Sequence, residues 1–285
     1  MIKITGTEHD LGGGLKIRRL LPNRQKRMVG PFIFLDHSGP LTTLPDQNID
    51  VRPHPHIGLS TVSYLFKGEV NHKDSLGTEQ LIVPGDVNWM TSGSGITHSE
   101  RTPNNLKGTP RDLHGLQMWV ALPDGKEDIA PSFAHYSRKD IPVFEDDDKK
   151  IDLVAGAGFG LQSPVQTTSP LIFANFEAKK QQTFALEADE FEYAIYMIDG
   201  EAEVNGETIS SLTMQTLDKG QKNLVQVKQG SKLIIIGGEP FSTPRHIWWN
   251  LVSSSKQKIE DAKASWKDRS FPQIAGEDDL IPLPE

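Results

Sequence analysis

The feature that most constrains this chain of 285 residues is an internal repeat. Residues 64–70 read YLFKGEV and residues 196–202 read YMIDGEA, an offset of 132 (196 − 64 = 132). A later glycine turn also recurs, as Gly85 and Gly220, with an offset of 135 (220 − 85 = 135). A tyrosine-led strand followed twice by a glycine turn indicates a duplicated β unit. We therefore expect two similar β-barrels and two domains, which divide the chain at 1–135 and 136–285.

Short runs of strand-forming residues, separated by glycine and proline, make up most of the chain. Residues 61–66 alternate with a period of two, as in a strand. Asn205-Gly206 is the strongest short hairpin signal, and it separates the runs 201–204 and 207–209. Many short strands bounded by turns are typical of a sandwich or barrel, so we expect an all-β fold.

One helix is expected, and it lies near the C-terminus. Ser254 and Gln257 have the spacing of a capping box. Ile259, Ala262 and Trp266 follow at i, i+3 and i+7, which predicts one apolar helix face. We expect this face to pack across the barrels.

Composition excludes several kinds of site and partner. The chain has no cysteine, which excludes disulfides, thiolate zinc sites, iron–sulfur clusters and a cysteine nucleophile. A chain without disulfides suits the cytoplasm. The net charge of −8 (30 Lys and Arg against 38 Asp and Glu) argues against direct binding to nucleic acid or to an anionic membrane. No apolar run approaches the roughly 18 residues of a membrane-spanning helix.

Two pairs of candidate metal ligands stand at positions i and i+2. His54 and His56 form the first pair, and His98 and Glu100 form the second. Residues i and i+2 of a strand point to the same face, so each pair converges on one side of its strand. Three imidazoles and one carboxylate brought together inside a barrel form a site for a first-row transition metal. The alternative is that these residues are polar groups of the surface or of loops.

The repeat offers an internal comparison for these four positions. A shift of 132 moves the first pair onto Leu186 and Ala188, and a shift of 135 moves the second pair onto Leu233 and Ile235. All four residues are apolar or small. We therefore expect only the N-terminal barrel to bind metal, while side chains fill the second.

The motifs in their order resemble those of the cupins, and most specifically those of the pirin family. A His-x-His pair, a Pro-Gly-Asp turn, a glycine-rich turn and a third histidine are similar to the cupin pattern. Residues 54–65 (HPHIGLSTVSYL) and 84–100 (PGDVNWMTSGSGITHSE) resemble the first and second pirin motifs. Residues 32–37, 116–123 and 249–253 add to the resemblance, which covers nearly the whole chain.

The resemblance implies two tandem, jelly-roll-like cupin barrels with one divalent transition metal. The matching ligands are His54, His56, His98 and Glu100. Iron is the metal that the family implies, and Mn, Co, Ni, Cu or Zn also suit such ligands.

The resemblance also implies an activity. Some members resemble quercetin 2,3-dioxygenases, which open the heterocyclic ring of a flavonol with O₂. The partners would then be a flavonol-like small molecule and O₂, and Glu100 would be the candidate general base as well as a ligand. A second hypothesis is an iron-dependent transcriptional co-regulator that acts through a protein partner without turnover. A third is a barrel whose metal only stabilises the fold.

The sequence departs from the family after His56. The family usually has Arg-Gly-Phe-Glu there, whereas this chain has Ile-Gly-Leu-Ser at 57–60 and no further glutamate before Glu69. Glu100 is then the one carboxylate that the motifs provide for the metal, and substrate preference is the property most affected.

Other polar and aromatic residues have weaker signals. His37 and His114 could orient a ligand from behind it, although a structural role in the core is the alternative. Four large side chains are expected in the core, with some lining a pocket: Trp89, Met90, Met118 and Trp119. Four histidines show no partner pattern and receive no role: His9, His72, His135 and His246.

Overall fold

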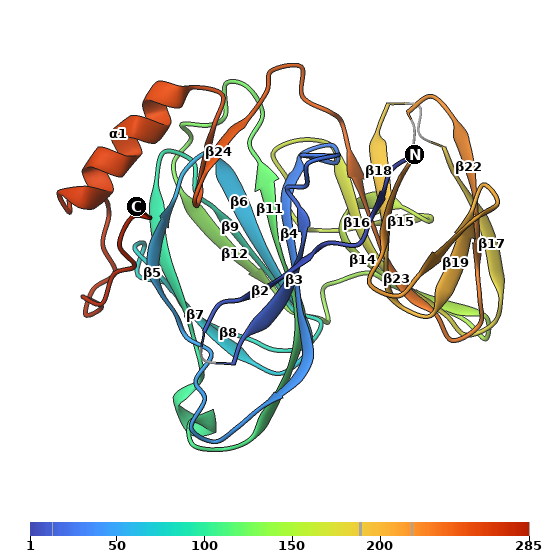
Figure 1. Ribbon diagram of the computed structural model, residues 1–285, viewed down its shortest axis with the longest axis horizontal. Helices are drawn as coiled ribbons and strands as arrows, with labels where there is room; N and C mark the ends of the chain where they lie inside the picture. Colours follow the sequence, from blue (N-terminus) through green and yellow to red (C-terminus); the bar gives the residue numbers. More distant parts are fainter. Residues whose placement is uncertain (13, 188–189, 218, 285) are drawn as a thin grey trace. The chain divides into compact units, whose positions relative to one another are not determined.

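The computed structural model describes residues 1–12, 14–187, 190–217 and 219–284 (Figure 1). Strands dominate this part of the chain, and the chain forms two compact units. The predicted all-β fold with a C-terminal helix is confirmed. The segments of unit 1 are Met1–Thr7, Arg19–Leu35 and Lys139–Phe241. The segments of unit 2 are Glu8–Arg18, Asp36–Arg138 and Ser242–Glu285.

This division differs in part from the predicted one, and the boundary at 135/136 stays a prediction. The chain passes from unit 2 to unit 1 between Arg138 and Lys139. The two ends of the chain lie with the unit opposite to the one expected for them. The reason is pairing, because strand β1 (Lys3–Ile4) is hydrogen-bonded to β21 (Met214–Leu217) of unit 1.

Unit 2 contains the four-stranded sheet that carries the predicted ligands. In spatial order its strands are β5 (Val51–His56), β10 (Ile96–Arg101), β7 (Val70–Asp74) and β8 (Glu79–Ile82). Most of a seven-stranded sheet also belongs to this unit. Its order is β12 (Ser132–Tyr136), β9 (Val87–Thr91), β6 (Leu59–Lys67), β11 (Arg111–Ala121), β4 (Phe32–Thr43), β3 (Lys16–Leu21) and β2 (Thr7–Asp10). The sheets face each other, since Ser63 of β6 donates a hydrogen bond to Glu100 of β10 at 3.2 Å.

Unit 1 repeats this arrangement with an apolar interior. Its larger sheet has the order β1, β21, β18 (Glu192–Asp199), β23 (Lys232–Gly238), β16 (Leu171–Ala178), β14 (Lys149–Gly158) and β13 (Val143–Glu145), and β15 (Leu161–Gln162) pairs with β14. Its smaller sheet has the order β17 (Gln182–Glu187), β22 (Lys222–Val227), β19 (Glu201–Val204) and β20 (Glu207–Ser210). A cluster of buried side chains that includes Leu186, Val225 and Ile235 fills the space.

Two local predictions are confirmed by these strands. Residues 61–66 lie within β6. Asn205 and Gly206 connect β19 to β20, and both have a positive φ, of 49° and 84°. Asn-Gly suits such a hairpin because glycine, and to a lesser extent asparagine, tolerates the left-handed backbone conformation.

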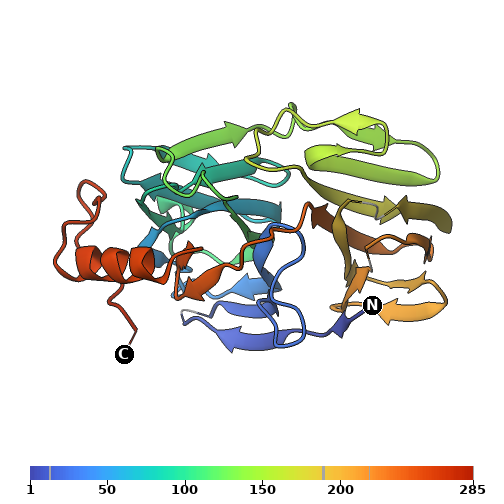
Figure 2. The ribbon, with the colours of Figure 1, turned by 90° about the horizontal axis from the view of Figure 1, so that it is seen from above.

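Helix α1 (Lys256–Lys267) follows a short hairpin of β24 (His246–Trp248) and β25 (Leu251–Ser253). Figures 1 and 2 show it on the outside of the strands of unit 2. The predicted apolar face is confirmed, because Ile259, Ala262 and Trp266 are buried in a cluster with Ile57 and Leu251. No helix in the described part of the chain is long and apolar enough to cross a membrane.

The predicted capping box at Ser254 is wrong. The residue at the N-cap is Ser255, and its side chain makes no capping hydrogen bond. Ser254 donates instead to the buried carboxylate of Glu127, from its backbone N–H at 2.7 Å and from its hydroxyl at 3.2 Å. Hydrogen bonds to an ionised carboxylate are stronger than neutral ones, which explains why this serine turns away from the helix.

The repeat is real in its topology, but the offset of 135 used for the second pair does not identify the equivalent strand. The strand order β5-β10-β7-β8 corresponds to β17-β22-β19-β20. The predicted counterparts Leu233 and Ile235 lie on β23, which corresponds to β11 and not to β10. Ala188 lies outside the described residues. The residues of unit 1 at the positions of the four candidate ligands are nevertheless apolar: Phe184, Leu186, Val225 and Val227.

Candidate metal centre

The two predicted ligand pairs lie on neighbouring antiparallel strands. In the register of β5 and β10, His98 is directly opposite His54, and Ile96 is opposite His56. Side chains opposite or diagonal to one another on one face of a sheet are within contact distance. The three histidines therefore converge on the interior face of this sheet.

Strand β5 carries two prolines next to these histidines, and its position in the sheet explains why the prolines are tolerated. It lies at the edge of its sheet, where a residue without an N–H is tolerated. The register with β10 shifts between His98 and Glu100, where β5 contains one extra residue. Bulges of this kind are common beside functional sites because they re-aim side chains. The backbone N–H of Ile281 covers this edge by donating to the Pro53 carbonyl at 2.9 Å.

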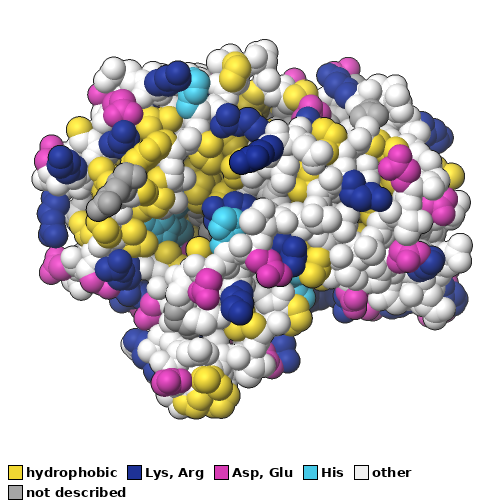
Figure 3. Space-filling view, in the orientation of Figure 1, with side chains coloured by type: hydrophobic (Ala, Val, Ile, Leu, Met, Phe, Trp, Pro, Cys, Tyr) yellow, Lys and Arg dark blue, Asp and Glu magenta, His cyan; other side chains and the backbone are white. Residues whose placement is uncertain are grey.

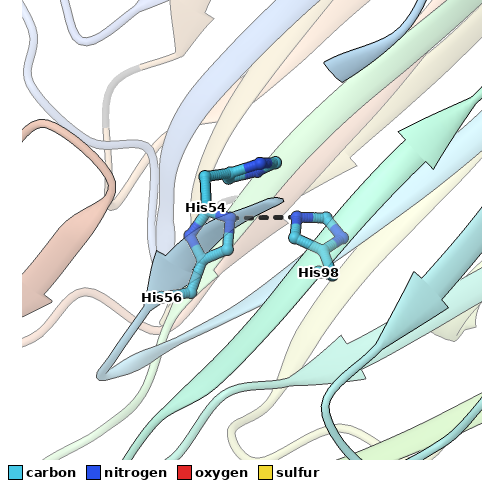
Figure 4. Close-up of side chains that lie close together, drawn as sticks. All are labelled: His54, His56 and His98. Atoms are coloured by element: carbon cyan, nitrogen blue, oxygen red, sulfur yellow. Dashed lines mark hydrogen bonds between the residues drawn. The ribbon is translucent and has the colours of Figure 1, made fainter. Parts of the chain in front are cut away.

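The imidazole rings of His54, His56 and His98 are in mutual contact (Figure 4). Their ring centroids are 4.4 to 5.0 Å apart, and one ligand atom from each lies within 4.8 Å of the others. Nε2 of His56 and Nε2 of His98 are 3.1 Å apart. Two nitrogens at about 2.1 Å from one metal have this separation when the angle between them is about 95°. The spacing therefore suits two adjacent ligands of one ion.

Two of these rings have their second nitrogen fixed by a backbone carbonyl. Nδ1 of His54 donates to the Arg52 carbonyl at 2.8 Å, and Nδ1 of His56 donates to the Asn250 carbonyl at 3.0 Å. A carbonyl only accepts, so the proton of each neutral ring is on Nδ1. The lone pair of Nε2 is then free for a metal, as in most histidine-ligated sites.

Burial keeps the three rings neutral. It lowers the pKa of His54 from 6.5 to about 4. Burial, together with the neighbouring imidazoles, also lowers the pKa values of His56 and His98 well below 6.5. Since a metal ligand must offer an unprotonated nitrogen, three neutral imidazoles at neutral pH are a suitable donor set for a divalent ion.

Glu100 lies on the same face of β10 but is not one of the three residues that form this group. Its carboxylate accepts a hydrogen bond from Ser63, whose hydroxyl also lies 2.8 Å from Oε1 of Gln117. Burial raises the pKa of Glu100, and the field of His72 and the Ser63 hydrogen bond oppose this only in part. Its role as a fourth ligand stays a prediction.

The comparisons with known proteins agree with this geometry. Residues 14–120 match the Pirin family model, and residues 173–272 match the model of the pirin C-terminal cupin domain. A pirin-like protein of Caulobacter vibrioides is 44% identical over 278 residues, which are 96% of each chain. The chain belongs to the pirin family.

Other pirin relatives have names that refer to chemistry. A Pseudomonas aeruginosa protein named as a candidate quercetin 2,3-dioxygenase is 39% identical, over 93% of this chain and 83% of the relative. A crystal structure of a quercetin 2,3-dioxygenase from Acinetobacter baumannii is 37% identical and has a TM-score of 0.91, covering 100% of this chain and 95% of that one. A pirin of Escherichia coli in complex with nickel(II) is 20% identical, over 84% of this chain and 99% of that one, with a TM-score of 0.67, which supports the fold alone.

The large side chains predicted for the core of the pirin barrel are buried, and one of them borders the centre. Trp89, Met90, Met118 and Trp119 are all buried, as predicted. Trp119 meets the His56 ring edge-on at 5.3 Å, so this tryptophan is a wall of the candidate centre. Figure 3 shows histidine side chains recessed among hydrophobic ones on the face of unit 2 that it presents.

His37 and His114 form a pair of their own in this pirin. Their Nε2 atoms are 2.8 Å apart and their rings stack at 5.0 Å. Burial, then the neighbouring His114 and Arg18, lowers the pKa of His37 to about 3. The pair satisfies one nitrogen of each ring, which supports the structural interpretation over the ligand-orienting one.

Sequence reasoning missed two residues next to the centre. His72 received no role, and Asp74 was not considered. Both lie on β7, and Asp74 is directly opposite His98 in the register. Nδ1 of His72 is 3.4 Å from Nδ1 of His98, and Nε2 of His72 is 3.1 Å from Oδ2 of Asp74. The signal was present in the sequence, because His72 and Asp74 have the same i, i+2 spacing as the ligand pairs.

A cavity of about 340 Å³ also lies within unit 2. Its walls come from helix α1, the loop of Gly93 to Gly95, Glu127 and Phe271. None of the three histidines lines it, so its size alone does not make it the reactive site. The convergent imidazoles of β5 and β10 are the stronger candidate for a metal site.

Proposed function

We propose that this member of the pirin family is a metal-dependent dioxygenase that opens the ring of a flavonol-like substrate with O₂. The observation that carries the proposal is the group of three buried, neutral histidines with their ligand atoms within 4.8 Å of one another. Relatives named for quercetin 2,3-dioxygenase activity at 39% and 37% identity support the substrate class.

The metal would be held by His54, His56 and His98, with Glu100 as the proposed fourth ligand. The donor set contains nitrogen and oxygen without sulfur, which suits Fe, Mn, Co, Ni, Cu or Zn. Iron is the metal that we expect first. A bound divalent ion would supply Lewis acidity toward a substrate hydroxyl and a site for O₂.

Glu100 is the proposed general base for the flavonol 3-hydroxyl. Its burial raises its pKa, which makes the carboxylate a stronger proton acceptor than an exposed glutamate. Ser63 holds one carboxylate oxygen and so limits the orientations of the side chain. Glu100 would receive the proton of the 3-hydroxyl, and the substrate oxygen would then lie near the imidazoles.

The interior around the histidines suits a flat aromatic substrate. The Trp119 ring is at the edge of His56, and the Phe133 ring stacks on His72 at 4.6 Å. Aromatic walls favour ring systems by burial of apolar area and by stacking. They also exclude water, which strengthens the electrostatic interactions of Glu100.

The test is aerobic turnover of quercetin by protein loaded separately with Fe, Mn, Co, Ni or Cu. We expect loss of quercetin absorbance and release of carbon monoxide with at least one metal. His54→Ala should abolish the reaction, whereas His9→Ala, at an exposed histidine of β2, should leave it intact. No turnover with any of the five metals would refute the dioxygenase proposal. The described residues offer no observation that favours the regulatory alternative.

A further inference from the structure

Strand β7 places a buried histidine–carboxylate pair behind the candidate metal centre. His72 and Asp74 are 3% and 1% exposed, and they face the same interior as His98. The contacts form a chain from Asp74 Oδ2 to His72 Nε2 at 3.1 Å, and from His72 Nδ1 to His98 Nδ1 at 3.4 Å. Nε2 of His98 lies at the other end, 3.1 Å from Nε2 of His56.

The pair is held firmly from both sides. Oδ1 of Asp74 accepts the backbone N–H groups of Leu76 and Thr78, at 2.9 and 3.1 Å. Its other oxygen is therefore left for His72. The His72 ring stacks on Phe133 with an angle of 25° between the ring planes. Neither His72 nor Asp74 can easily turn away from the chain of contacts.

The direction of the hydrogen bonds in this chain follows from the carboxylate. Oδ1 of Asp74 accepts two backbone N–H groups and Oδ2 lies 3.1 Å from Nε2 of His72, an arrangement that suits an ionised carboxylate. An ionised carboxylate only accepts hydrogen bonds, so Nε2 of His72 carries a proton. In a neutral ring Nδ1 of His72 is then an acceptor, and the proton between the two rings belongs to Nδ1 of His98. Nε2 of His98 keeps its lone pair.

We propose that Asp74 and His72 are positioning residues that fix the tautomer and the orientation of His98, so that Nε2 of His98 faces the metal. The two backbone carbonyls at His54 and His56 do the same for the other ligands, and His98 is the one whose partner is a side chain. This inference rests on the proposed metal centre.

Unit 1 supports the assignment independently. At the equivalent positions of β19, the residues opposite Val225 and Val227 are Val204 and Ala202. Where the ligands are absent, the histidine–carboxylate pair is absent as well. A pair that served only to stabilise this barrel fold would not have to disappear together with the ligands.

The decisive comparison is His72→Asn against His72→Leu, with Co(II) as the probe in competition titrations. Asparagine places a carbonyl oxygen at the position of Nδ1 relative to Cβ, so it can still accept from His98. Leucine has a similar size without an acceptor. Loss of such a partner typically weakens metal affinity about 10- to 100-fold. We expect that loss for His72→Leu, and at most a small change for His72→Asn.

Asp74→Asn provides a second and subtler test. Its amide oxygen can keep the hydrogen bonds from Leu76 and Thr78, while its NH₂ group faces His72. The NH₂ group donates, which moves the proton of His72 to Nδ1 and sets two donors against each other at His98. We expect a loss of Co(II) affinity comparable to that of His72→Leu, although the substitution is nearly isosteric.

Nitrogen NMR of protein labelled with ¹⁵N-histidine and loaded with Zn(II) reads the tautomers directly. In the wild type we expect His98 protonated at Nδ1 and His72 protonated at Nε2. In Asp74→Asn the proton of His72 should move to Nδ1. Wild-type spectra with the proton of His72 on Nδ1 would overturn the inference.

The outcomes separate this inference from the proposed function. If the wild type binds no Co(II), the metal centre itself is refuted. If it binds Co(II), and His72→Leu and His72→Asn bind it equally well, the positioning role is wrong and the centre stands. Circular dichroism establishes whether each apo variant is folded. If His72→Leu does not fold, Asp74→Asn and the wild-type tautomers decide the question.

Discussion

The two four-stranded sheets of this protein have equivalent strand orders, but the side chains on their interior faces are polar in unit 2 and apolar in unit 1. Tyr64 and Tyr196 are opposite Val87 and Met214 in their sheets. His98 and Val225 each follow 11 residues after these partners (98 − 87 = 11; 225 − 214 = 11). The cross-strand registers then pair the interior positions of the two barrels as His54 with Phe184, His56 with Leu186, His98 with Val225, Glu100 with Val227, His72 with Ala202 and Asp74 with Val204.

The difference between the two interiors shows that the same strand arrangement can enclose either apolar or polar side chains. Apolar residues fill the interior of unit 1, where each buried aliphatic side chain contributes about 1.5 to 3 kcal/mol to stability. The polar residues of unit 2 cannot contribute in this way, and every one of them needs a partner to offset its desolvation. Each of the six has a side-chain or backbone hydrogen-bond partner in its own unit. An apolar core and a polar interior with a candidate metal centre are therefore built on equivalent strands.

The strongest test of the comparison replaces His98 of unit 2 with valine, the residue that unit 1 has at the equivalent position, Val225. We expect His98→Val to reduce bound metal from stoichiometric to background, because it removes the central ligand. Metal analysis of protein purified without chelator measures this. His9→Val is the matched control, and it should retain the metal. Full metal content in His98→Val would refute the assigned ligands.

Glu100→Gln tests whether the carboxylate acts on the proton or on the metal. If Glu100 is the general base, kcat should fall about 10²- to 10⁴-fold because the amide cannot accept the proton. Bound metal, measured on the same sample, should then decrease less than in His98→Val. Glu79→Gln, at an exposed position of β8, is the control. Unchanged turnover of Glu100→Gln would remove this residue from the mechanism.

Leu186→Ala and His56→Ala change equivalent positions and should have contrasting effects. Leu186→Ala leaves a cavity in an apolar core and should lower the free energy of unfolding by about 2 to 5 kcal/mol without affecting bound metal. His56→Ala should remove metal and change the stability of the apo protein less. Urea titrations and metal analysis of both variants measure this. Equal losses of stability in the apo proteins would mean that the two interiors are not different in kind.

Acid should destabilise unit 2 more than unit 1, because all nine histidines lie in unit 2. The pKa of His54 is lowered from 6.5 to about 4 by burial, so the unfolded state binds protons more readily. The stability from this group is complete above pH 6.5 and is lost as the pH falls toward 4, by about 3 kcal/mol at most. Hydrogen exchange of the apo protein at pH 7 and pH 5 should show weaker protection of β5 and β10 at pH 5, and little change in β17 and β22. Uniform behaviour of all four strands would contradict this.

Much of the fold and the pairing of the candidate ligands on one strand face were predictable because the relevant signals are local. The hairpin at Asn205-Gly206 and the buried face of helix α1 depend on neighbouring residues and were predicted correctly. The capping box failed because the buried carboxylate of Glu127, far away in sequence, forms stronger hydrogen bonds with Ser254 than the helix end does.

The equivalent strands of the two copies could not be identified from local sequence patterns alone. The equivalent strands are offset by 130 residues at His54 (184 − 54 = 130) and by 127 at His98 (225 − 98 = 127), because the loops of the two copies differ in length. The offset of 135, taken from the glycine turns, is eight residues longer than the offset at His98 and therefore led to β23 in place of β22.

The sequence by itself determined that His54 shares a face with His56, and His98 with Glu100, because side chains in any strand alternate with a period of two. Only the tertiary structure decided that the two pairs meet and that His72 and Asp74 stand behind His98. Those relations depend on the register between strands that are distant in sequence. The register is set by long-range hydrogen bonding and by burial of one face, which no local pattern contains.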